Sequence, residues 1–466
     1  MYPEYDKTNK YSIWEYSKLL IGKTLAEAIY PEVINQEFSG KGRLGQLVEK
    51  YYFKYKVNCL QEADFSEANI ELKCTPLKEL KDKSLTIKER LVCTMINYSD
   101  VYKVPFNKSH LYLKCAEMLI LFYLHKSEVS VEHLKFIYSV LWSIPEKDLL
   151  IIEQDYNKIL NKIVKGKAHE LSEGDTTYLG ACRKGQKGDS NQTYVLPNGE
   201  TALISAPKRA FSLKPAYMRT ILEFAKNSKT PFSFNTSSDL TSDYELISKD
   251  ELMFNSFEDI LINRFKPYYG KSYNDLCDDL LHEASNAKNK YALIANAILT
   301  EKKKRGDNIK NSEEWIKSDI RLKTIRLKES GRSKEAMSFE NIDYFEILNE
   351  DDWTDSRLYE IFTSRFLFIV FKEIKGQYQL EKAFFWTMPY NDLEEAAIFW
   401  RDIKENVRKN QIDSKYFYKE SYHKKFHVRP KAKNSEDLAE NPHGGKAKKY
   451  CYWFNHDYVN EIVIRN

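Results

Sequence analysis

The sequence predicts an α/β protein that contains two tandem copies of one domain. Three observations support this prediction: apolar residues recur with both strand and helix periods, the order of the patterned segments repeats, and a polar stretch separates the two repeats. The 466 residues are enough for two or three domains of ~150 residues each. We expect domains at residues 1–228 and 251–466, joined by a Ser-, Thr- and Asn-rich linker at 229–250.

The composition narrows the class of protein but does not identify a partner. Lys and Arg number 72 against 68 Asp and Glu, and 42% of the residues are hydrophobic, which can supply ordinary cores. No apolar run approaches the ~20 residues that a membrane span needs, and the amino end is polar. Seven widely spaced cysteines with no CxxC pair argue against a disulfide framework or a zinc knuckle. We therefore expect a soluble cytoplasmic protein.

Four patterned segments define the first half. Residues 41–56 and 147–165 carry apolar side chains at helical spacing and predict amphipathic helices. Residues 70–75 alternate between apolar and charged side chains, as on a strand with one buried face. Residues 114–125 are nearly continuously apolar and predict a buried central strand. Helices around a few strands are thus expected.

The second half repeats this order. Residues 319–323 look like a second copy of residues 69–73, and the next apolar run follows 41 residues after Lys73 and 42 residues after Lys323. A helical stretch around Trp400 then matches the helix at 147–165. An ordered series of such agreements predicts a duplicated domain.

One Glu-x-Lys motif is a candidate for catalysis. Glu71 and Lys73 lie on the alternating strand, Asp64 lies seven residues upstream, and Glu49 lies on the preceding helix. Strand geometry places Glu71 and Lys73 on one face, about 6.6 Å apart. Metal-dependent hydrolysis of a phosphodiester needs convergent carboxylates for Mg²⁺ and a cation beside the attacking water. The alternative is an exposed strand with surface charges, because the motif is common in a chain that is 30% charged.

The order of these motifs resembles the MutH family of endonucleases. The resemblance is carried by residues 41–49, 63–65 and 70–76, and continues through Ser109, His110, Lys114 and residues 163–172, 178–179 and 209–214. It spans most of residues 15–225, and the second copy extends it to about residue 460. The sequence is closer still to the two-domain type II restriction endonucleases of that family, which cut GATC. This resemblance implies two restriction-endonuclease-like PD-(D/E)xK domains, each a mixed central sheet flanked by helices.

The resemblance also implies roles for residues in the first domain. Asp64 and Glu71 match the carboxylates that bind Mg²⁺, and Lys73 matches the catalytic lysine. Glu49 matches the helix carboxylate that completes the site, and Lys114 a second lysine near it. Whether Lys73 acts as a base or only positions water stays open, because a metal lowers its pKa and the acids raise it.

A basic segment at residues 181–214 is a candidate for DNA recognition, with a local net charge of +4. By resemblance, Arg183 and Lys184 occupy the base-contacting loop, and Lys214 belongs to the same DNA-binding set. Ser212 stands where MutH has a tyrosine associated with sensing adenine methylation, so we predict weak discrimination against N6-methyladenine. A solvated loop would show the same composition.

The second domain has kept different features. Arg321 stands at the position of Glu71 and Ile298 near that of Glu49, so we expect this domain to be catalytically inactive. Residues 421–450 have a local net charge of +5, and their segment with Arg429 and Lys431 resembles the base-reading loop of MutH. This combination predicts a second DNA-binding site with an effector role. The alternative is a decayed structural lid.

The sequence therefore predicts a type II restriction endonuclease that cuts double-stranded DNA at 5′-GATC-3′, 5′ of the guanine, with Mg²⁺. One active site per chain implies that two chains meet on DNA or that two nicks occur in succession. A cognate methyltransferase is expected to act on the same DNA site. The alternatives are a strand-nicking, mismatch-repair-type endonuclease and a non-cleaving GATC-binding regulator.

Overall fold

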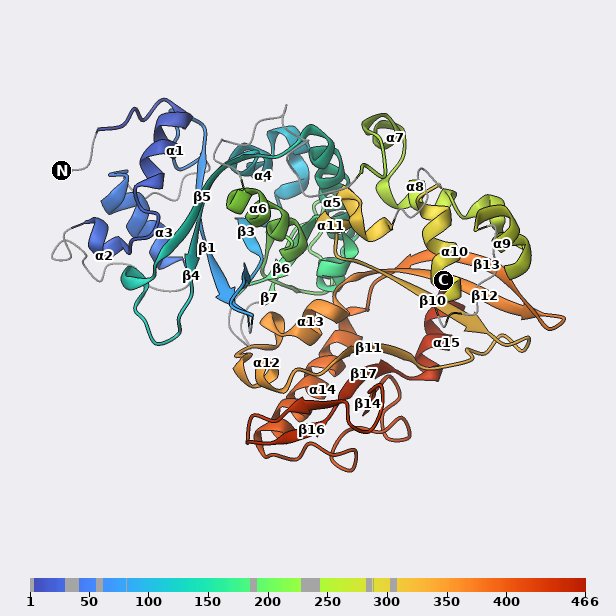
Figure 1. Ribbon diagram of the computed structural model, residues 1–466. Helices are drawn as coiled ribbons and strands as arrows, with labels where there is room; N and C mark the ends of the chain where they lie inside the picture. The colour runs from blue at the N-terminus through green and yellow to red at the C-terminus, as the bar shows by residue number, and fades with distance from the viewer. Residues whose placement is uncertain are drawn as a thin grey trace. The chain divides into compact units, whose positions relative to one another are not determined.

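The computed structural model describes residues 4–29, 42–55, 62–80, 82–184, 191–227, 244–281, 287, 289–301 and 308–466. The chain divides into two compact units, and each mixes helices and strands (Figure 1). The first unit is Met1–Ser256 with Lys310–Asp319, and the second is Phe257–Ile309 with Ile320–Asn466. Every helix in the described part of the chain is too short or too polar to cross a membrane.

The first unit is built around a four-stranded mixed sheet in the order β2-β1-β4-β5. Strand β1 is parallel to β4 and antiparallel to β2, and β5 is antiparallel to β4. A second sheet of three antiparallel strands has the order β3-β9-β6. The principal strands are β1 (Glu71–Glu79), β2 (Leu85–Ile87), β3 (Leu91–Met95), β4 (Glu117–Leu124), β5 (Phe136–Ser143), β6 (Leu179–Arg183) and β9 (Arg209–Leu213), with short strands β7 (Asn191–Gln192) and β8 (Ala206–Pro207). The helices are α1 (Lys10–Lys18), α2 (Leu25–Ala28), α3 (Arg43–Leu47), α4 (His110–Cys115), α5 (Glu146–Val164), α6 (Pro215–Asn227), α7 (Lys249–Phe254) and α11 (Glu313–Lys317).

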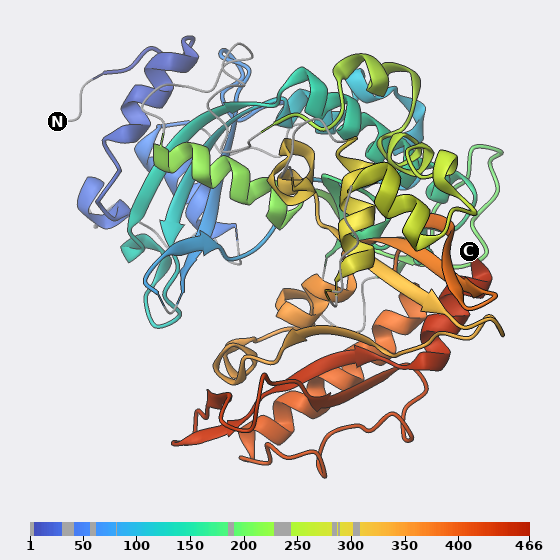
Figure 2. The same cartoon turned by 45° about the vertical axis from the view of Figure 1, so that its right-hand side comes forward.

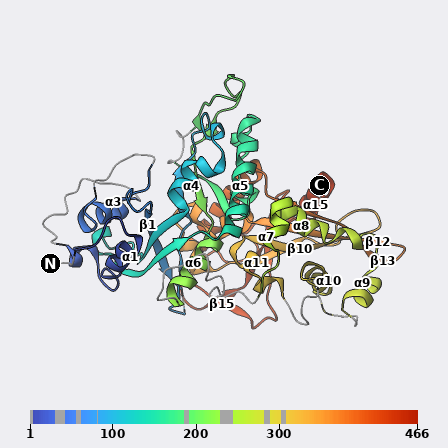
Figure 3. The ribbon, with the colours of Figure 1, turned by 90° about the horizontal axis from the view of Figure 1, so that it is seen from above.

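Helices cover both faces of the four-stranded sheet. Leu72 of β1 belongs to an apolar core that α1, α2 and α3 complete, and α1 lies beside β5 in Figures 1 and 3. On the opposite face, the ring of Trp142 on β5 packs against Tyr217 and Phe224 of α6. The strand predicted at 70–75 is present, but the expectation of one buried face is wrong. Glu71 is only 2% exposed, because β1 is an inner strand with helices above and below it.

The long helix of the first unit lies where the apolar period predicts it. Helix α5 covers Glu146–Val164, against an expected 147–165. Its buried Asp155 accepts hydrogen bonds from the backbone N–H groups of Thr177, Tyr178 and Leu179, at 2.6 to 3.0 Å. A side chain in the middle of α5 thereby fixes the start of β6, the strand that leads into the basic segment.

Two segments differ from their predicted form. The strand expected at 114–125 starts only at Glu117, because the hydroxyl of Ser109 accepts from the N–H of Tyr112 and begins helix α4 at His110. Lys114 therefore lies on a helix. The helix expected at 41–56 is α3 followed by a single π-helical turn, η2 (Val48–Tyr52), a form that often occurs at functional sites.

The second unit repeats the order and pairing of the first. Strand β10 is parallel to β12, and β13 is antiparallel to β12, as for β1, β4 and β5. The sheet β11-β17-β14 corresponds to β3-β9-β6, and α14 lies along it (Figure 2). Its main strands are β10 (Ile320–Leu327), β11 (Met337–Asn341), β12 (Arg365–Ile374), β13 (Gln377–Trp386), β14 (Phe426–Pro430) and β17 (Tyr450–Phe454), with short strands β15 (Leu438–Glu440) and β16 (Lys446–Lys448). The helices are α8 (Phe257–Asn263), α9 (Tyr273–Leu280), α10 (Lys290–Leu299), α12 (Tyr344–Asn349), α13 (Arg357–Phe362), α14 (Tyr390–Arg408) and α15 (His456–Arg465).

The compact units do not coincide with the expected domains. Helix α7 and residues Lys310–Asp319 belong to the first unit, and most of the expected linker lies outside the described residues. The carboxylate of Glu314 accepts from the N–H groups of Leu246 and Ile247, at 2.9 and 3.0 Å. Lys317 is fully buried and its ammonium lies 2.7 Å from Asp148 of α5. These contacts fix a segment from the second half of the sequence to the first unit.

Candidate active site

The start of β1 brings two lysines to one carboxylate. The Nζ atom of Lys73 lies 2.6 Å from Oε1 of Glu71, and Nζ of Lys114 lies 3.4 Å from the same oxygen. Lys73 reaches Glu71 because alternate side chains of a strand share one face. Lys114 reaches it from the last turn of α4, the helix directly before the neighbouring strand β4. Spacing in the sequence therefore predicts the contact between Lys73 and Glu71, but it does not predict the contact between Lys114 and Glu71.

Asp64 is held against Glu71 by a tight turn. The backbone of Phe65 pairs with that of Ile70, and Asn69 takes a left-handed conformation (φ 54°), which asparagine tolerates better than most residues. The turn places the N–H of Asp64 3.3 Å from Oε2 of Glu71. In return, Oδ2 of Asp64 accepts from the N–H of Leu72 at 3.0 Å. Two carboxylates that are seven residues apart in the sequence thus become neighbours.

Glu49 completes the acidic group from the π-helical turn η2. Its side chain is buried, with a residue exposure of 7%. The pKa of Glu49 is raised to about 7. Burial contributes most, the carboxylates of Asp64 and Glu71 add to it, and Lys114 and Lys73 oppose it by smaller amounts. Burial and the charge of Glu71 also raise the pKa of Asp64. The negative charge at this site therefore exceeds what the lysines neutralise.

Lys73 is held as an ammonium ion. Burial lowers its pKa, but the adjacent Glu71 carboxylate more than offsets that effect, and the net pKa is raised above the usual lysine value. Its ammonium also lies 3.5 Å from the backbone carbonyl oxygen of Cys93. These acceptors favour the charged, hydrogen-bond-donating form of Lys73, an effect that a bound metal ion would oppose.

The donor chemistry of this group fits a hard divalent cation. Carboxylate oxygens are the protein ligands that Mg²⁺ prefers, and a cation beside them would favour the charged forms of Glu49 and Asp64, which burial above all and the neighbouring carboxylates disfavour. The arrangement is not yet a coordination sphere. Across the described ranges, no three His, Cys, Asp or Glu side chains converge closely enough to hold a metal ion. The Oε1 atom of Glu71 is occupied by Lys73 and Lys114 instead.

The two predicted base-reading segments start at corresponding places. Arg183 is exposed at the end of β6, and the N–H of Lys184 donates to the carbonyl oxygen of Lys208. In the second unit, Lys431 follows β14 and its N–H donates to the carbonyl oxygen of Lys449. Residues 185–190, which directly follow Lys184 in the first segment, lie outside the described residues. The guanidinium of Arg429 is exposed and lies 4.2 Å from the ring centroid of Trp453.

Two residues predicted to bind DNA are buried instead. Ser212 is 0% exposed, because β9 is the middle strand of its sheet and all five of its residues are covered, and Lys214, directly after β9, is 2% exposed. The ammonium of Lys214 donates to the carbonyl oxygen of Thr176 at 2.6 Å. Neither side chain faces the surface, so their assignment as DNA contacts is corrected here.

The corresponding place in the second unit carries a different network. Arg321, at the start of β10, donates to Glu340 at 2.8 Å, and Arg357 of α13 donates to the same carboxylate at 2.7 Å. The expectation that Arg321 replaces a carboxylate is met in this geometry, and Ile298 is a buried residue of α10. Glu340 and Arg357 were not expected from the sequence, because they come from β11 and α13 and form no local motif.

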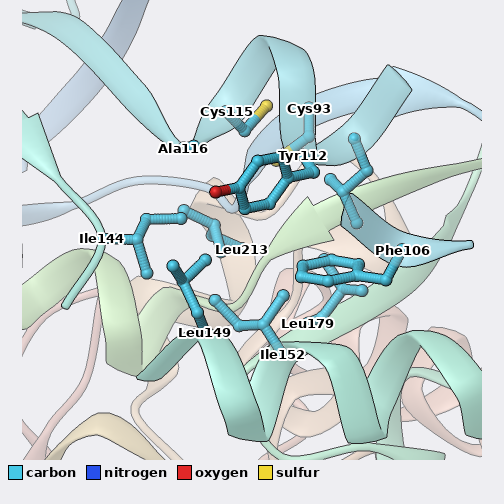
Figure 4. A pocket seen from close by; sticks show the side chains of 11 residues that line it. Cys93, Phe106, Tyr112, Cys115, Ala116, Ile144, Leu149, Ile152, Leu179 and Leu213 are labelled. Atoms are coloured by element: carbon cyan, nitrogen blue, oxygen red, sulfur yellow. The ribbon is translucent and has the colours of Figure 1, made fainter. Parts of the chain in front are cut away.

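A pocket beside α4 is apolar and distinct from the carboxylate group. Side chains from α4 and α5 line it together with Cys93 and Leu213, and the hydroxyl of Tyr112 is one of its few polar groups (Figure 4). Such a lining offers little to a phosphate or a metal ion. The candidate site is therefore the carboxylate–lysine group and not this pocket.

Fold and site together define a MutH-type endonuclease. The family described as DNA mismatch repair enzyme MutH matches residues 53–155, which contain Asp64, Glu71, Lys73 and Lys114. The chain is 26% identical to the DNA mismatch repair protein MutH of Shewanella woodyi, over 40% of this chain and 77% of that protein. It is 31% identical to the type II restriction enzyme Sau3AI of Staphylococcus aureus, over 98% of this chain and 95% of that enzyme. The chain therefore belongs to the MutH-related family of type II restriction endonucleases, and it is a site-specific deoxyribonuclease.

Proposed function

We propose that the protein hydrolyses double-stranded DNA at 5′-GATC-3′ with Mg²⁺, cleaving 5′ of the guanine. The observation that carries this proposal is the convergence of Lys73 and Lys114 on Glu71, with Asp64 in contact with the same carboxylate. Carboxylates and ammonium groups are the side chains that metal-assisted hydrolysis of a phosphodiester requires. The recognition sequence rests on the resemblance of residues 41–76 and of the basic segments to family members that cut GATC.

Asp64 and Glu71 would hold the Mg²⁺ ion. Bound there, the ion would supply Lewis-acid stabilisation of charge on the phosphate and a more acidic bound water. Both oxygens of Glu71 already have donors in this structure, because Lys73 and Lys114 lie at Oε1 and the N–H of Asp64 lies at Oε2.

The remaining side chains have separate tasks. Lys73 and Lys114, as ammonium ions, orient the attacking water and offset the negative charge that develops on the phosphate oxygens. The raised pKa of Lys73 favours this positioning role over that of a general base. Glu49, whose pKa is about 7 without a bound ion, completes the acidic group, and a cation beside it would lower that pKa and favour its charged form.

For the whole chain, we propose two tandem PD-(D/E)xK domains with different tasks. The first unit cuts, and the second binds another copy of the DNA site as an effector. Arg321 supports this division, because a guanidinium paired with Glu340 repels a metal ion where Glu71 would attract one. We further propose that the enzyme works in the cytoplasm, that two chains meet on DNA for double-strand cleavage, and that a cognate methyltransferase modifies the same site.

Digestion of a supercoiled plasmid tests the proposal. With Mg²⁺, we expect linear fragments whose sequenced ends begin with 5′-GATC, and no product when EDTA replaces Mg²⁺. Accumulation of open circles without linear DNA would instead identify a strand-nicking endonuclease. Specific binding of a GATC duplex without any cleavage would identify a regulator. Ends at another sequence would contradict the proposed specificity.

A further inference from the structure

The second unit gathers cations where the first unit gathers carboxylates. Arg321 and Lys323 of β10 take the positions of Glu71 and Lys73 on β1, since both strands pair in parallel with the next long strand of their sheets. Lys431, directly after β14, joins them from the neighbouring three-stranded sheet. The three side chains come from two separate sheets of one unit.

Contacts to one short stretch of β11 hold the two lysines side by side. The ammonium of Lys323 donates to the carbonyl oxygen of Ser338 at 2.8 Å. The ammonium of Lys431 donates to the hydroxyl of the same serine at 3.0 Å and to the carbonyl oxygen of Phe339 at 3.1 Å. Within the described part of the chain, Lys323 makes this one hydrogen bond, and its ammonium also lies 4.7 Å from the ring centroid of Phe339. A lysine has three donor hydrogens, so a ligand could accept from those that Ser338 does not engage. Neither lysine forms an ion pair with any acidic side chain that the structure describes.

The one carboxylate close by is already engaged. Glu340 binds Arg321 at 2.8 Å and Arg357 at 2.7 Å, and these two guanidinium groups hold its pKa below the usual value although burial opposes them. The cluster therefore retains an excess of positive charge. Consistently, burial lowers the pKa of Lys323 to about 8, and the charges of Arg321 and Lys431 add to that effect. An anion beside Lys323 would stabilise the charged form of its ammonium group.

We propose that Lys323, Lys431 and Arg321 form a binding site for a backbone phosphate of DNA, without a metal ion. The inference deepens the effector role proposed for the second unit and rests on it. A phosphodiester carries one negative charge and two free oxygens, which suits two adjacent ammonium groups. DNA is favoured over a free anion because Lys431 lies within the basic stretch 421–450, whose other cations lie on both sides of it in the sequence and can contact neighbouring phosphates.

The test measures binding by the full-length protein in EDTA, where cleavage cannot contribute. The probes are a GATC duplex and, separately, inorganic phosphate. We compare the parent with Lys323→Gln and Lys431→Gln, and use Lys328→Gln as the matched control, since Lys328 is exposed at the end of the same strand. Each of the first two changes should weaken duplex binding roughly tenfold and reduce the slope of log K against log salt by about one. The control should change neither quantity.

Each result is decisive. Equal affinity and equal salt slope in the parent, Lys323→Gln and Lys431→Gln would overturn the proposal, and Lys431, being exposed, can be replaced without risk to folding. Binding of inorganic phosphate that depends on Lys323, with unchanged duplex binding, would overturn DNA as the source of the phosphate. Failure of plasmid cleavage would contradict the proposed enzyme function but would leave these binding measurements intact.

Discussion

At the scale of single residues, Glu71 connects three other members of the candidate site. It contacts Lys73, Lys114 and the backbone of Asp64, and it is almost fully buried. We expect Glu71→Gln to lower the cleavage rate more than about 100-fold, because a ligand of the metal ion and the partner of two lysines are lost together. The measurement is the rate of plasmid linearisation at saturating Mg²⁺.

The matched control is Glu79→Gln. Glu79 lies at the exposed end of the same strand and pairs only with Lys83 on the surface. Its replacement should leave the rate within about twofold of the parent, since exposed ion pairs contribute little. Equal rates for Glu71→Gln and the parent would remove Glu71 from the site.

The raised pKa of Glu49 predicts that the stability of the folded protein depends on pH. Its pKa is raised from 4.5 to about 7 in the folded protein, so between these values the folded state holds a proton that the unfolded chain has released. This contribution to stability is complete below pH 4.5 and is lost as the pH rises through 7. In thermal unfolding without divalent metal, Glu49→Gln should show a smaller fall in Tm between pH 5 and 7.5 than the parent. Parallel curves for the two proteins would contradict the assignment.

The lowered pKa of Lys323 predicts that the affinity of the protein for DNA depends on pH. With a pKa of about 8, its ammonium loses its proton between pH 7 and pH 9, and its attraction for a phosphate falls accordingly. Arg321, Lys431, Cys451 and Glu340 are the charged or titratable groups that face it. Duplex affinity in EDTA should therefore decline over this range in the parent and remain nearly flat in Lys323→Arg, because arginine stays charged. A decline of equal size in both proteins would point to another group.

At the scale of elements, the contact between α5 and α11 predicts a large change in stability. Lys317 and Asp148 are both buried, at 0% and 2% side-chain exposure, and Asp148 also accepts from the hydroxyl of Tyr217 at 2.8 Å. Lys317→Met leaves a buried carboxylate without its cation and should destabilise the protein by about 3 kcal/mol. Urea unfolding measures the loss. The double variant Lys317→Met with Asp148→Asn should recover part of it, and no recovery would argue against the pair.

The elements also explain which parts of the fold the sequence could predict. Helix α5 has a clear period and lies within one residue of its expected bounds, whereas β1 starts near its expected position but continues to Glu79, beyond the strand expected at 70–75. Residues 114–125 mislead because an apolar run fits a buried strand and a buried helix equally well, and only the cap at Ser109 decides between them. The turn η2 lacks any local signal, because a π turn depends on how the segment packs.

The residues of the candidate site also fall into two groups: those that spacing in the sequence predicts, and those that it does not. Asp64, Glu71 and Lys73 are close in sequence, so a turn and a strand suffice to bring them together. Ser212 lies on the middle strand of a sheet and Lys214 directly follows that strand, and the burial of both comes from neighbours that are distant in sequence. Contacts made by Lys114 and Glu340 arise from packing of separate elements and could not be read from spacing.

Cleavage of methylated DNA tests whether Ser212 of β9 takes part in sensing an adenine methyl group. A buried Ser212 offers no side chain to an adenine methyl group, so we expect unmethylated and N6-methylated GATC duplexes to be cut at rates within about threefold. Rates on the two duplexes at equal enzyme concentration provide the measurement. Cleavage confined to the unmethylated duplex would mean that another residue senses the methyl group.

At the scale of the whole molecule, two units with different charge patterns predict dependence on two DNA sites. If the second unit binds an effector copy, a plasmid with two GATC sites should be cut several-fold faster than a plasmid with one. Addition of a short GATC duplex should accelerate cleavage of the one-site plasmid, whereas a duplex without GATC should not. Equal rates on both plasmids, with no response to added duplex, would contradict the effector role.

The exchange of a short segment between the units has a consequence for how such an enzyme can evolve. The chain passes from one unit to the other after Ser256, after Ile309 and after Asp319. A gene cut after Ser256 separates Asp148 from Lys317, and a cut after Asp319 divides the second unit. Neither unit can therefore be released whole by truncation at one boundary. A gene that ended at Ser256 would leave Asp148 buried without its cation and would need compensating changes around α5.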